Sequence, residues 1–342
     1  MPVQYAGVLK EHEQVRTTVG VFDVGHMGEF FLRGPGAEAT LDLLATNNVA
    51  RMQDGQAVYT ALCNESGGVR DDALIYRLAS DYYMMVVNAS NTAKIYEWTQ
   101  EHLQPGTELE DHTEEVALLA VQGPKSRELL KQLAPLGELA ASLDDLGYYR
   151  FVQTGPRPGN DGLLVSRTGY TGELGFEVYC GAQQAVELWD ALLAGAGGVR
   201  AEPIGLAARD TLRFEVGYCL YGHELEEDTS PLEAGIGWTV KLKKPRFLGQ
   251  DVLRQQKADG IPRALVGLEL AERAIARQGF EVLSGDKVVG KVTSGTFAPT
   301  LQKSLALALV DRAHAADALT IRIRGRAMET KTIPLPFHSA GS

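Results

Sequence analysis

Two acidic residues stand side by side in the segment GGVRDDALIY (67–76). The segment predicts a β-strand, in which adjacent side chains point to opposite faces, so Asp71 and Asp72 are not expected to share a site. Asp72, Leu74 and Tyr76 share one face, where a carboxylate and a phenol with an apolar floor between them can address one ligand. The alternative is a strand end with a solvated acidic pair, which composition alone favours.

A second carboxylate, Glu177, stands in the segment SRTGYTGELGFEVY (166–179), after two glycine-containing turns that present Tyr170. On the pleat, Glu177 faces opposite to Phe176 and Val178, so it points either to solvent or into a polar cavity. A buried carboxylate needs hydrogen-bond donors, and the paired N–H groups at the edge of a pterin or a guanine are of that kind.

Two arginines lie four residues apart in GLAARDTLRFEVG (205–217), which predicts a helix. Arg209 and Arg213 therefore share a helix face. Ordinary surface arginines are the plain alternative, and so is an ion pair between Arg209 and the adjacent Asp210.

Composition excludes several classes of function. The 342 residues hold 33 Lys and Arg against 44 Asp and Glu, a net charge of −11, which argues against a general nucleic-acid binder. The apolar runs are too short to span a membrane and the N-terminus lacks a secretion signal, so a cytoplasmic protein is expected. The three cysteines and seven histidines form no metal-binding motif. The chain also lacks the GxGxxG motif that would suggest a flavin-binding module.

One structural unit recurs along the chain. FFLRGPGAEATLDLL (30–44) and LAVQGPKSRELLKQL (119–133) each combine an apolar strand, a Gly-Pro corner and an amphipathic helix. A third version covers 176–193, and another strand–helix pair covers 82–103. Such paired units predict an α+β body with ferredoxin-like packing, in which helices cover one face of an antiparallel sheet.

The last third of the chain shows a different pattern. From about residue 250 onward, short apolar runs alternate with glycine or polar breaks, which indicates a β-barrel or a jelly-roll. The segment KLKKPRFLGQ (241–250) marks the boundary. We therefore expect a body over residues 1–245, built from two α+β subdomains that are discontinuous in sequence, and a C-terminal β domain over 246–342.

Long strings spread over the chain resemble the aminomethyltransferase family, the T-protein of the glycine cleavage system. They include FDVGHMG (22–28), GQAVYTALCNESGGVRDDALIYRL (55–78), RTGYTGELGFEV (167–178) and GLAARDTLRFEVGYCLYGHELEEDTSPLEAGIGW (205–238). They keep the family's order and cover nearly the whole chain. The last of them, with its EDTSPLEAG tail, is the most specific.

The resemblance implies a three-domain ring with tetrahydrofolate, a substrate, in its central opening. It implies transfer of the one-carbon unit from the aminomethyl-lipoyl arm of H-protein to tetrahydrofolate, which yields 5,10-methylenetetrahydrofolate, ammonia and dihydrolipoyl H-protein. The partner is then lipoylated H-protein, and neither a metal nor a flavin takes part.

The resemblance also implies roles for individual residues. Asp72 matches the family's essential aspartate, near the reactive nitrogens of the folate. Glu177 matches the carboxylate that pairs with the amino edge of the pterin, and Arg209 matches a folate-site arginine. The remaining candidates for folate binding, two of them as aromatic walls, are Tyr76, Tyr170, Asn88 and Met27.

Two related functions remain as alternatives. One is a folate-binding protein of iron–sulfur assembly, whose signature resembles KGCYxGQE. GYCLYGHE (217–224) keeps the spacing of its Cys, Gly and Glu but lacks the Lys-Gly start and the Gln, so Cys219 is better interpreted as a small core residue. The other is a stand-alone folate-dependent demethylase, which H-protein dependence would distinguish.

A basic run in an acidic chain suggests a docking patch. KLKKPR (241–246) brings together four cations on a protein of net negative charge. Lipoyl carriers are commonly acidic, so the run can steer their encounter. A solvated interdomain loop is an equally good interpretation. The patch consists of Lys241, Lys243, Lys244 and Arg246.

Overall fold

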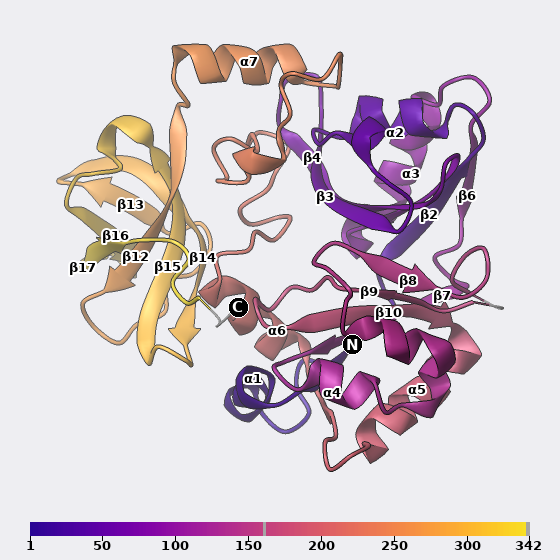
Figure 1. Ribbon diagram of the computed structural model, residues 1–342. Coiled ribbons are helices and arrows are strands. Elements are labelled where there is room, and N and C mark those ends of the chain that lie inside the picture. Colours follow the sequence, from indigo (N-terminus) through magenta and orange to yellow (C-terminus); the bar gives the residue numbers. More distant parts are fainter. Residues whose placement is uncertain (160–161, 340–342) are drawn as a thin grey trace.

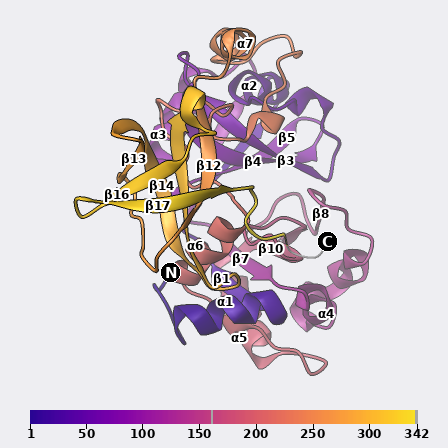
Figure 2. The same cartoon turned by 90° about the vertical axis from the view of Figure 1, so that its left-hand side faces the viewer.

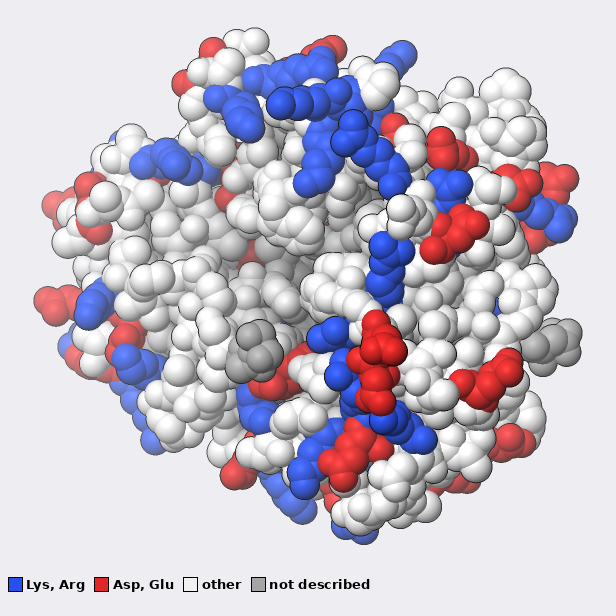
Figure 3. All heavy atoms as spheres, viewed as in Figure 1, with Lys and Arg blue, Asp and Glu red and all other residues white. Residues whose placement is uncertain are grey.

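The computed structural model describes residues 1–159 and 162–339. It contains two sheets, each covered by helices on its outer face, and a separate barrel (Figure 1). Seen from the same side, the three bodies surround a hollow (Figure 3). The predicted α+β ring with a C-terminal β-barrel is therefore confirmed. In the described part of the chain, no helix is long and apolar enough to cross a membrane.

One sheet carries Asp72 and is called the Asp sheet. Its strands, in spatial order, are β3 (Gln56–Cys63), β4 (Val69–Ala79), β5 (Tyr82–Val87), β2 (Gly28–Arg33) and β6 (Glu108–Asp111). All of its pairs are antiparallel. Helices α2 (Ala37–Leu44) and α3 (Thr92–Glu101) bury Leu41 and Ile95 against the outer face, where they meet Phe30 and Tyr83. This apolar layer fixes the sheet between its helices and the centre of the molecule.

The other sheet carries Glu177 and is called the Glu sheet. Its strands, in spatial order, are β11 (Glu202–Pro203), β1 (Gly20–Asp23), β7 (Val116–Gln122), β10 (Gly175–Gly181), β9 (Leu164–Ser166) and β8 (Phe151–Gln153). Its outer face is covered by α4 (Ser126–Leu130), the 3-10 segment η3 (Ala134–Leu143) and α5 (Ala182–Ala194). Only the β1–β11 pair is parallel.

The two sheets are versions of one unit, as the sequence predicts. In the Asp sheet, α2 follows β2, a meander β3-β4-β5 comes next, and α3 leads to β6. In the Glu sheet, α4 follows β7, the meander is β8-β9-β10, and α5 leads to β11, with β1 inserted beside β7. Each sheet contains the β-α-β-β-α-β arrangement of a ferredoxin-like fold with an additional edge strand.

The inner faces of the two sheets pack against each other. Phe31 and Met84 of the Asp sheet belong to the same apolar cluster as Ala120 and Leu164 of the Glu sheet. Helices α1 (Val8–Thr17) and α6 (Leu206–Glu215) close this layer through Val15, Ala208 and Leu212. The result is a four-layer body, which Figure 1 shows at the right of the molecule.

The last body is a closed six-stranded barrel, which faces the viewer in Figure 2. Its strands are β12 (Arg263–Leu270), β15 (Lys303–Asp311), β14 (Lys287–Ala298), β13 (Glu281–Ser284), β16 (Leu319–Ile323) and β17 (Arg326–Ile333). Phe214 of α6 packs on Leu305 and Leu307, so the barrel wall rests on the body.

The expectation of strands from residue 250 onward is wrong for its first ten residues. These form helix α7 (Gln250–Asp259), and the barrel begins at Arg263. The helix buries Leu253 against Cys63 and Val69 of the Asp sheet, rather than against the barrel. Its mostly polar sequence gives little apolar periodicity, which explains why the pattern did not reveal it.

Candidate active site

A cavity of about 750 Å³ lies where the three bodies meet. Both sheets contribute to its walls, as do the loop 217–238 and the barrel residue Leu265. Its volume falls in the range of small-molecule sites. Figure 3 shows the hollow at the centre of the molecule, with few charged atoms at the surface of its walls.

Asp72 faces this cavity from strand β4. One of its carboxylate oxygens accepts a hydrogen bond from the Tyr59 hydroxyl at 2.7 Å, and the other accepts one from Asn88 Nδ2 at 2.8 Å. Burial raises the pKa of Asp72, and these two hydrogen bonds oppose the rise by stabilising the anion. The two hydrogen bonds hold the carboxylate in one orientation.

Asp71 points to the other face of β4, as the strand pattern predicts. It is fully buried, so the alternative of a solvated acidic pair is wrong. However, Asn88 Nδ2 also lies 2.8 Å from Asp71 Oδ1, so one amide connects both carboxylates. Asn91 donates a further bond to Asp71 at 2.7 Å. Asp71 does not line the cavity, as predicted, but it positions Asn88, whose amide also bonds Asp72.

Glu177 lies on strand β10 and is 7% exposed. It accepts a hydrogen bond from the Thr168 hydroxyl and lines the cavity. Burial raises its pKa, while the Thr168 bond and the positive charge of Arg209 act in the opposite direction. The polar-cavity interpretation of Glu177 is thus the one that the structure supports, and the solvent-facing alternative is wrong.

Arg209 and Tyr170 lie together on another wall. The Arg209 guanidinium carbon is 4.5 Å from the centre of the Tyr170 ring, and the Tyr170 hydroxyl donates to the Cys219 carbonyl. Within residues 1–159 and 162–339, Arg209 makes no ion pair. Asp210 pairs instead with Arg213, at 2.7 Å. Arg209 therefore lines the cavity with a guanidinium group that no described carboxylate pairs with.

Arg213 has a structural role. It is 1% exposed and bonds Glu224 at 2.8 Å and Ser294 Oγ at 2.9 Å. These bonds tie α6, the loop that follows it and the barrel strand β14 together. Arg213 therefore fixes helix α6 against the barrel. This also fixes the position of Arg209 on the same helix, and Tyr170 packs against Arg209.

The placement of Tyr76 differs from the expectation. It is fully buried and does not line the cavity, so it cannot pack on a ligand there. Its hydroxyl lies 2.9 Å from the Tyr179 hydroxyl and 3.4 Å from Thr168 Oγ1. Since Thr168 bonds Glu177, Tyr76 supports the carboxylate from behind. Asn88 and Met27 do line the cavity.

Several aromatic walls were not found from the sequence. Tyr59 stacks on Trp238 with ring centres 5.8 Å apart, and Tyr218 lies 5.9 Å from Tyr170. Tyr149 completes the wall beside Glu177. They come from separate segments and converge only after folding, so no single motif marks them.

A buried glutamine holds the loop that carries Tyr170. Gln122 Nε2 donates to the Thr168 carbonyl at 3.3 Å, and its Oε1 accepts from Thr171 at 3.0 Å. A Cβ atom at Gly169 or Gly175 would clash with this side chain. The glycines of the turn motif thus allow the loop to close over Gln122.

The predicted docking patch loses one member. Lys244 is 3% exposed, and its Nζ bonds the Asn47 carbonyl and the Asp42 carboxylate, each at 2.8 Å. It also bonds carbonyls at the C-terminal end of α2, where a cation is favoured. Lys241, Lys243 and Arg246 are exposed. The sequence did not reveal the burial of Lys244, because its neighbours in the run are charged residues of the same kind.

No cluster of metal-ligating side chains occurs among the described residues. The cavity instead combines two carboxylates, one arginine and several aromatic rings, which suits a planar polar heterocycle with an anionic or polar extension.

The comparisons with known proteins agree with this fold. Residues 1–244 match the family described as GCVT N-terminal domain, and residues 263–338 match the glycine cleavage T-protein C-terminal barrel domain. The chain therefore belongs to the glycine cleavage T-protein family.

Curated relatives and a crystal structure cover the chain almost completely. It is 44% identical to an aminomethyltransferase of Halothermothrix orenii, over 98% of this chain and 93% of that one. It is 46% identical to an aminomethyltransferase of Geobacillus thermodenitrificans, over 99% and 92%. It is also similar to the glycine cleavage system aminomethyltransferase T of Bartonella henselae, with a TM-score of 0.89 and 31% identity, over 99% of this chain and 92% of that one.

Proposed function

We propose that this chain is a tetrahydrofolate-dependent aminomethyltransferase of the glycine cleavage system. It transfers the one-carbon unit of the aminomethyl-lipoyl arm of H-protein to tetrahydrofolate. The products are 5,10-methylenetetrahydrofolate, ammonia and dihydrolipoyl H-protein. Family membership supports the reaction, and the convergence of Asp72, Glu177 and Arg209 in one aromatic cavity supports the substrate. A cytoplasmic location stays a prediction.

Each wall of the cavity has a task in this proposal. Glu177, held by Thr168, accepts from the paired N–H groups at the amino edge of the pterin. Tyr170, Tyr149 and Met27 orient the ring system, and Arg209 meets the polar remainder of the folate. Asn88 acts indirectly, because its amide is already bonded to both aspartates.

Asp72 is the proposed catalytic residue. A folate nitrogen attacks the aminomethyl carbon while the bond between that carbon and the lipoyl sulfur breaks. The second folate nitrogen then attacks the same carbon as ammonia leaves. The two folate nitrogens each lose a proton, and these protons end on the sulfur and on the ammonia. Positive charge develops on the carbon, and a carboxylate beside it stabilises that charge and moves a proton, for about 10²–10⁴-fold. The aromatic walls exclude water, which would capture the carbon as formaldehyde.

The alternative functions fit less well. Cys219 is 5% exposed, its thiol lies 3.5 Å from the Ala234 carbonyl, and burial raises its pKa. It therefore has the character of a core residue rather than of a reactive thiol. The relatives described above are named as aminomethyltransferases, not as iron–sulfur assembly proteins or demethylases.

Ammonia release from methylamine-loaded lipoyl H-protein tests the proposal. Release should depend on added tetrahydrofolate and should be matched by methylenetetrahydrofolate in equal amount. Folate binding without release would favour the binding-protein alternative, and release of another one-carbon product from a free methylamine would favour the demethylase.

We also propose that the lipoyl carrier docks on the exposed cations Lys241, Lys243 and Arg246. Lys241 Nζ bonds the carbonyl of Trp238, a residue that lines the cavity, so this patch lies at the cavity rim. Arg254 of α7 joins it through a 2.9 Å bond to the Leu242 carbonyl. An acidic carrier would thus be steered to the point where its arm enters.

Charge reversal separates docking from folate binding. Lys243→Glu with Arg246→Glu should raise the Michaelis constant for H-protein at low salt, and high salt should reduce the difference. The control is Lys10→Glu with Lys125→Glu, which makes the same charge change at other exposed lysines. An equal effect in both double variants would show that the change in Michaelis constant comes from net charge, and would contradict docking at this patch.

A further inference from the structure

A second cavity opens at one end of the barrel. It has a volume of about 650 Å³ and shares no lining residue with the central cavity. Leu265, near the start of β12, lines the central cavity, whereas Arg273 and Ala274, just beyond the end of β12, line this one. The two sites therefore lie toward opposite ends of one strand.

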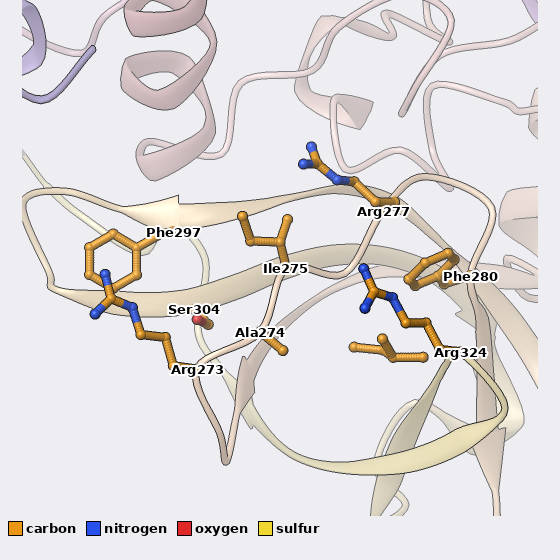
Figure 4. A pocket seen from close by; sticks show the side chains of 9 residues that line it. Arg273, Ala274, Ile275, Arg277, Phe280, Phe297, Ser304 and Arg324 are labelled. Atoms are coloured by element: carbon orange, nitrogen blue, oxygen red, sulfur yellow. The ribbon is translucent and has the colours of Figure 1, made fainter. Parts of the chain in front are cut away.

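The floor of the barrel-end cavity is apolar. Phe280, Ile323 and Ala274 belong to the cluster that fills the barrel interior. Phe297 of β14 is the cross-strand partner of Ser304 on β15. Figure 4 shows Phe280 and Phe297 among the side chains that line the pocket, with Ile275 between them. The mouth of a β-barrel is a preferred place for a small ligand.

A polar atom on this floor has no partner. Ser304 is 6% exposed, and its hydroxyl has no hydrogen bond with any described residue. A buried hydroxyl without a partner costs stability unless something satisfies it. Ser304 thus adds a buried polar group, which no described residue satisfies, to the otherwise apolar floor of this cavity.

Three arginines surround the mouth, namely Arg273, Arg277 and Arg324. Among the described residues, no acidic side chain pairs with any of them. By contrast, Arg322 and Arg326, in the same β16–β17 hairpin as Arg324, pair with Glu281 and Glu272. Arg273 lies over Phe297, 4.9 Å from the ring centre. Arg324 has φ 51°, a left-handed backbone that an arginine adopts at some cost in energy.

Charge distribution agrees with this arrangement. Residues 263–338 hold 11 Lys and Arg against 7 Asp and Glu, although the whole chain carries −11. The barrel is thus positive on an acidic protein, and its unpaired guanidinium groups gather where the barrel opens.

We propose that the barrel mouth binds an amphipathic anion, a carboxylate or phosphate on an apolar body. The apolar body lies against Phe280, Phe297 and Ile323. The head group meets the guanidinium groups of Arg273 and Arg324, and the Ser304 hydroxyl donates to a ligand oxygen. Guanidinium groups bind either head group through paired N–H donors.

Calorimetric titration with small probes tests the proposal. Hexyl phosphate and hexanoate differ in the head group, hexanol lacks the charge, and inorganic phosphate lacks the apolar body. At least one of the two amphipathic anions should bind in a 1:1 ratio, and the stronger one identifies the head group. Hexanol and inorganic phosphate should bind much more weakly. Equal binding of hexanol, or no binding of either anion, would overturn the proposal.

Matched variants locate the binding. Arg273→Ala with Arg324→Ala should raise the dissociation constant about 30-fold, as expected for two exposed charge contacts of about 1 kcal/mol each. Arg322→Ala with Arg326→Ala removes the same charge from the same hairpin and should leave binding unchanged. Arg209→Ala in the central cavity should do the same. All these arginines except Arg209 are exposed, so unchanged thermal unfolding should accompany their replacement. Binding that survives in Arg273→Ala/Arg324→Ala but is lost in Arg209→Ala would place the anion in the central cavity and refute the barrel site.

Discussion

Met84 of the Asp sheet and Glu177 of the Glu sheet occupy the same position of a repeated unit. Met84 lies between Phe31 and Tyr76 on the neighbouring strands, and Glu177 lies between Ala120 and Ser166. Both rows face the layer between the sheets. The Asp sheet fills that layer with large side chains, whereas the Glu sheet leaves room and places a carboxylate there.

Another pair of equivalent positions shows the reverse. Counted back from the Gly-Pro corners at 34 and 123, Glu29 of β2 corresponds to Leu118 of β7. Glu29 is fully buried, and neither of its oxygens has a partner among the described residues. Leu118 lines the cavity. A buried carboxylate thus occurs in both copies of the unit. Glu177, unlike Glu29, lines the cavity, where a ligand can form hydrogen bonds with it.

The largest expected effect concerns Asp72, the proposed catalytic carboxylate. Asp72→Asn should lower the turnover number by about 10²–10⁴-fold, because the amide can neither move the proton nor stabilise the developing charge. Folate affinity, measured by calorimetry, should stay within a few-fold. A parallel loss of affinity would make Asp72 a binding residue.

Met84→Glu gives the Asp sheet the residue of the Glu sheet. Met84 is fully buried between large side chains, so the new carboxylate has no room for a partner. The free energy of unfolding should fall by about 3–5 kcal/mol at neutral pH. Met84→Leu is the volume control and should cost less than about 1.5 kcal/mol in urea titrations. Equal costs would mean that this layer accepts charge in either sheet.

The opposite exchange, Glu177→Met, should separate binding from stability. The dissociation constant for folate should rise about 10- to 100-fold, because a hydrogen bond to a charged group contributes about 1.5–3 kcal/mol. The melting temperature should rise, since a buried carboxylate is removed. Glu177→Gln keeps the shape and tests the charge alone. An unchanged affinity in Glu177→Met would refute the assignment of Glu177 to the pterin edge.

Glu29→Gln tests the unsatisfied carboxyl group through pH. Burial raises the pKa of Glu29 to about 9, from an ordinary value of 4.5. Above pH 4.5 the unfolded chain releases this proton while the folded protein retains it, so the wild type loses stability as pH rises toward 9. The variant should gain on the wild type by up to about 1.4 kcal/mol per pH unit between pH 5 and 8. Glu13→Gln, on an exposed part of α1, should show no such trend.

Tyr76→Phe should have the smallest effect. It removes the hydroxyl that connects the sheets through Tyr179, at a cost of about 1 kcal/mol in unfolding free energy. Folate affinity should change less than about threefold, because Tyr76 does not line the cavity. A loss as large as that of Glu177→Met would restore Tyr76 as a contact residue.

The repeated unit could be predicted because its signals are local. In each copy, the strand, the Gly-Pro corner and the helix lie within about fifteen residues of sequence. The structure contains both copies. The carboxylates Asp72 and Glu177 also stood out, because each is a charged residue on an otherwise apolar strand face.

The remainder of the site depends on long-range contacts. Tyr59 and Trp238 are 179 positions apart in sequence and meet only when the loop after α6 folds over the Asp sheet. Lys244 and Lys243 are neighbours of the same type, yet one is buried at the end of α2 and the other is exposed. Neither difference leaves a trace in local composition.

Trp238 gives the protein a built-in optical signal. It is 56% exposed at the cavity rim, whereas Trp98 is 6% exposed and lies in the outer layer of the Asp sheet, and Trp189 lies on α5. Its ring stacks on Tyr59, whose hydroxyl bonds Asp72. A ligand or a lipoyl arm that enters the cavity must change the solvent around this indole. We therefore expect its emission to follow occupancy of the cavity in real time, without a label.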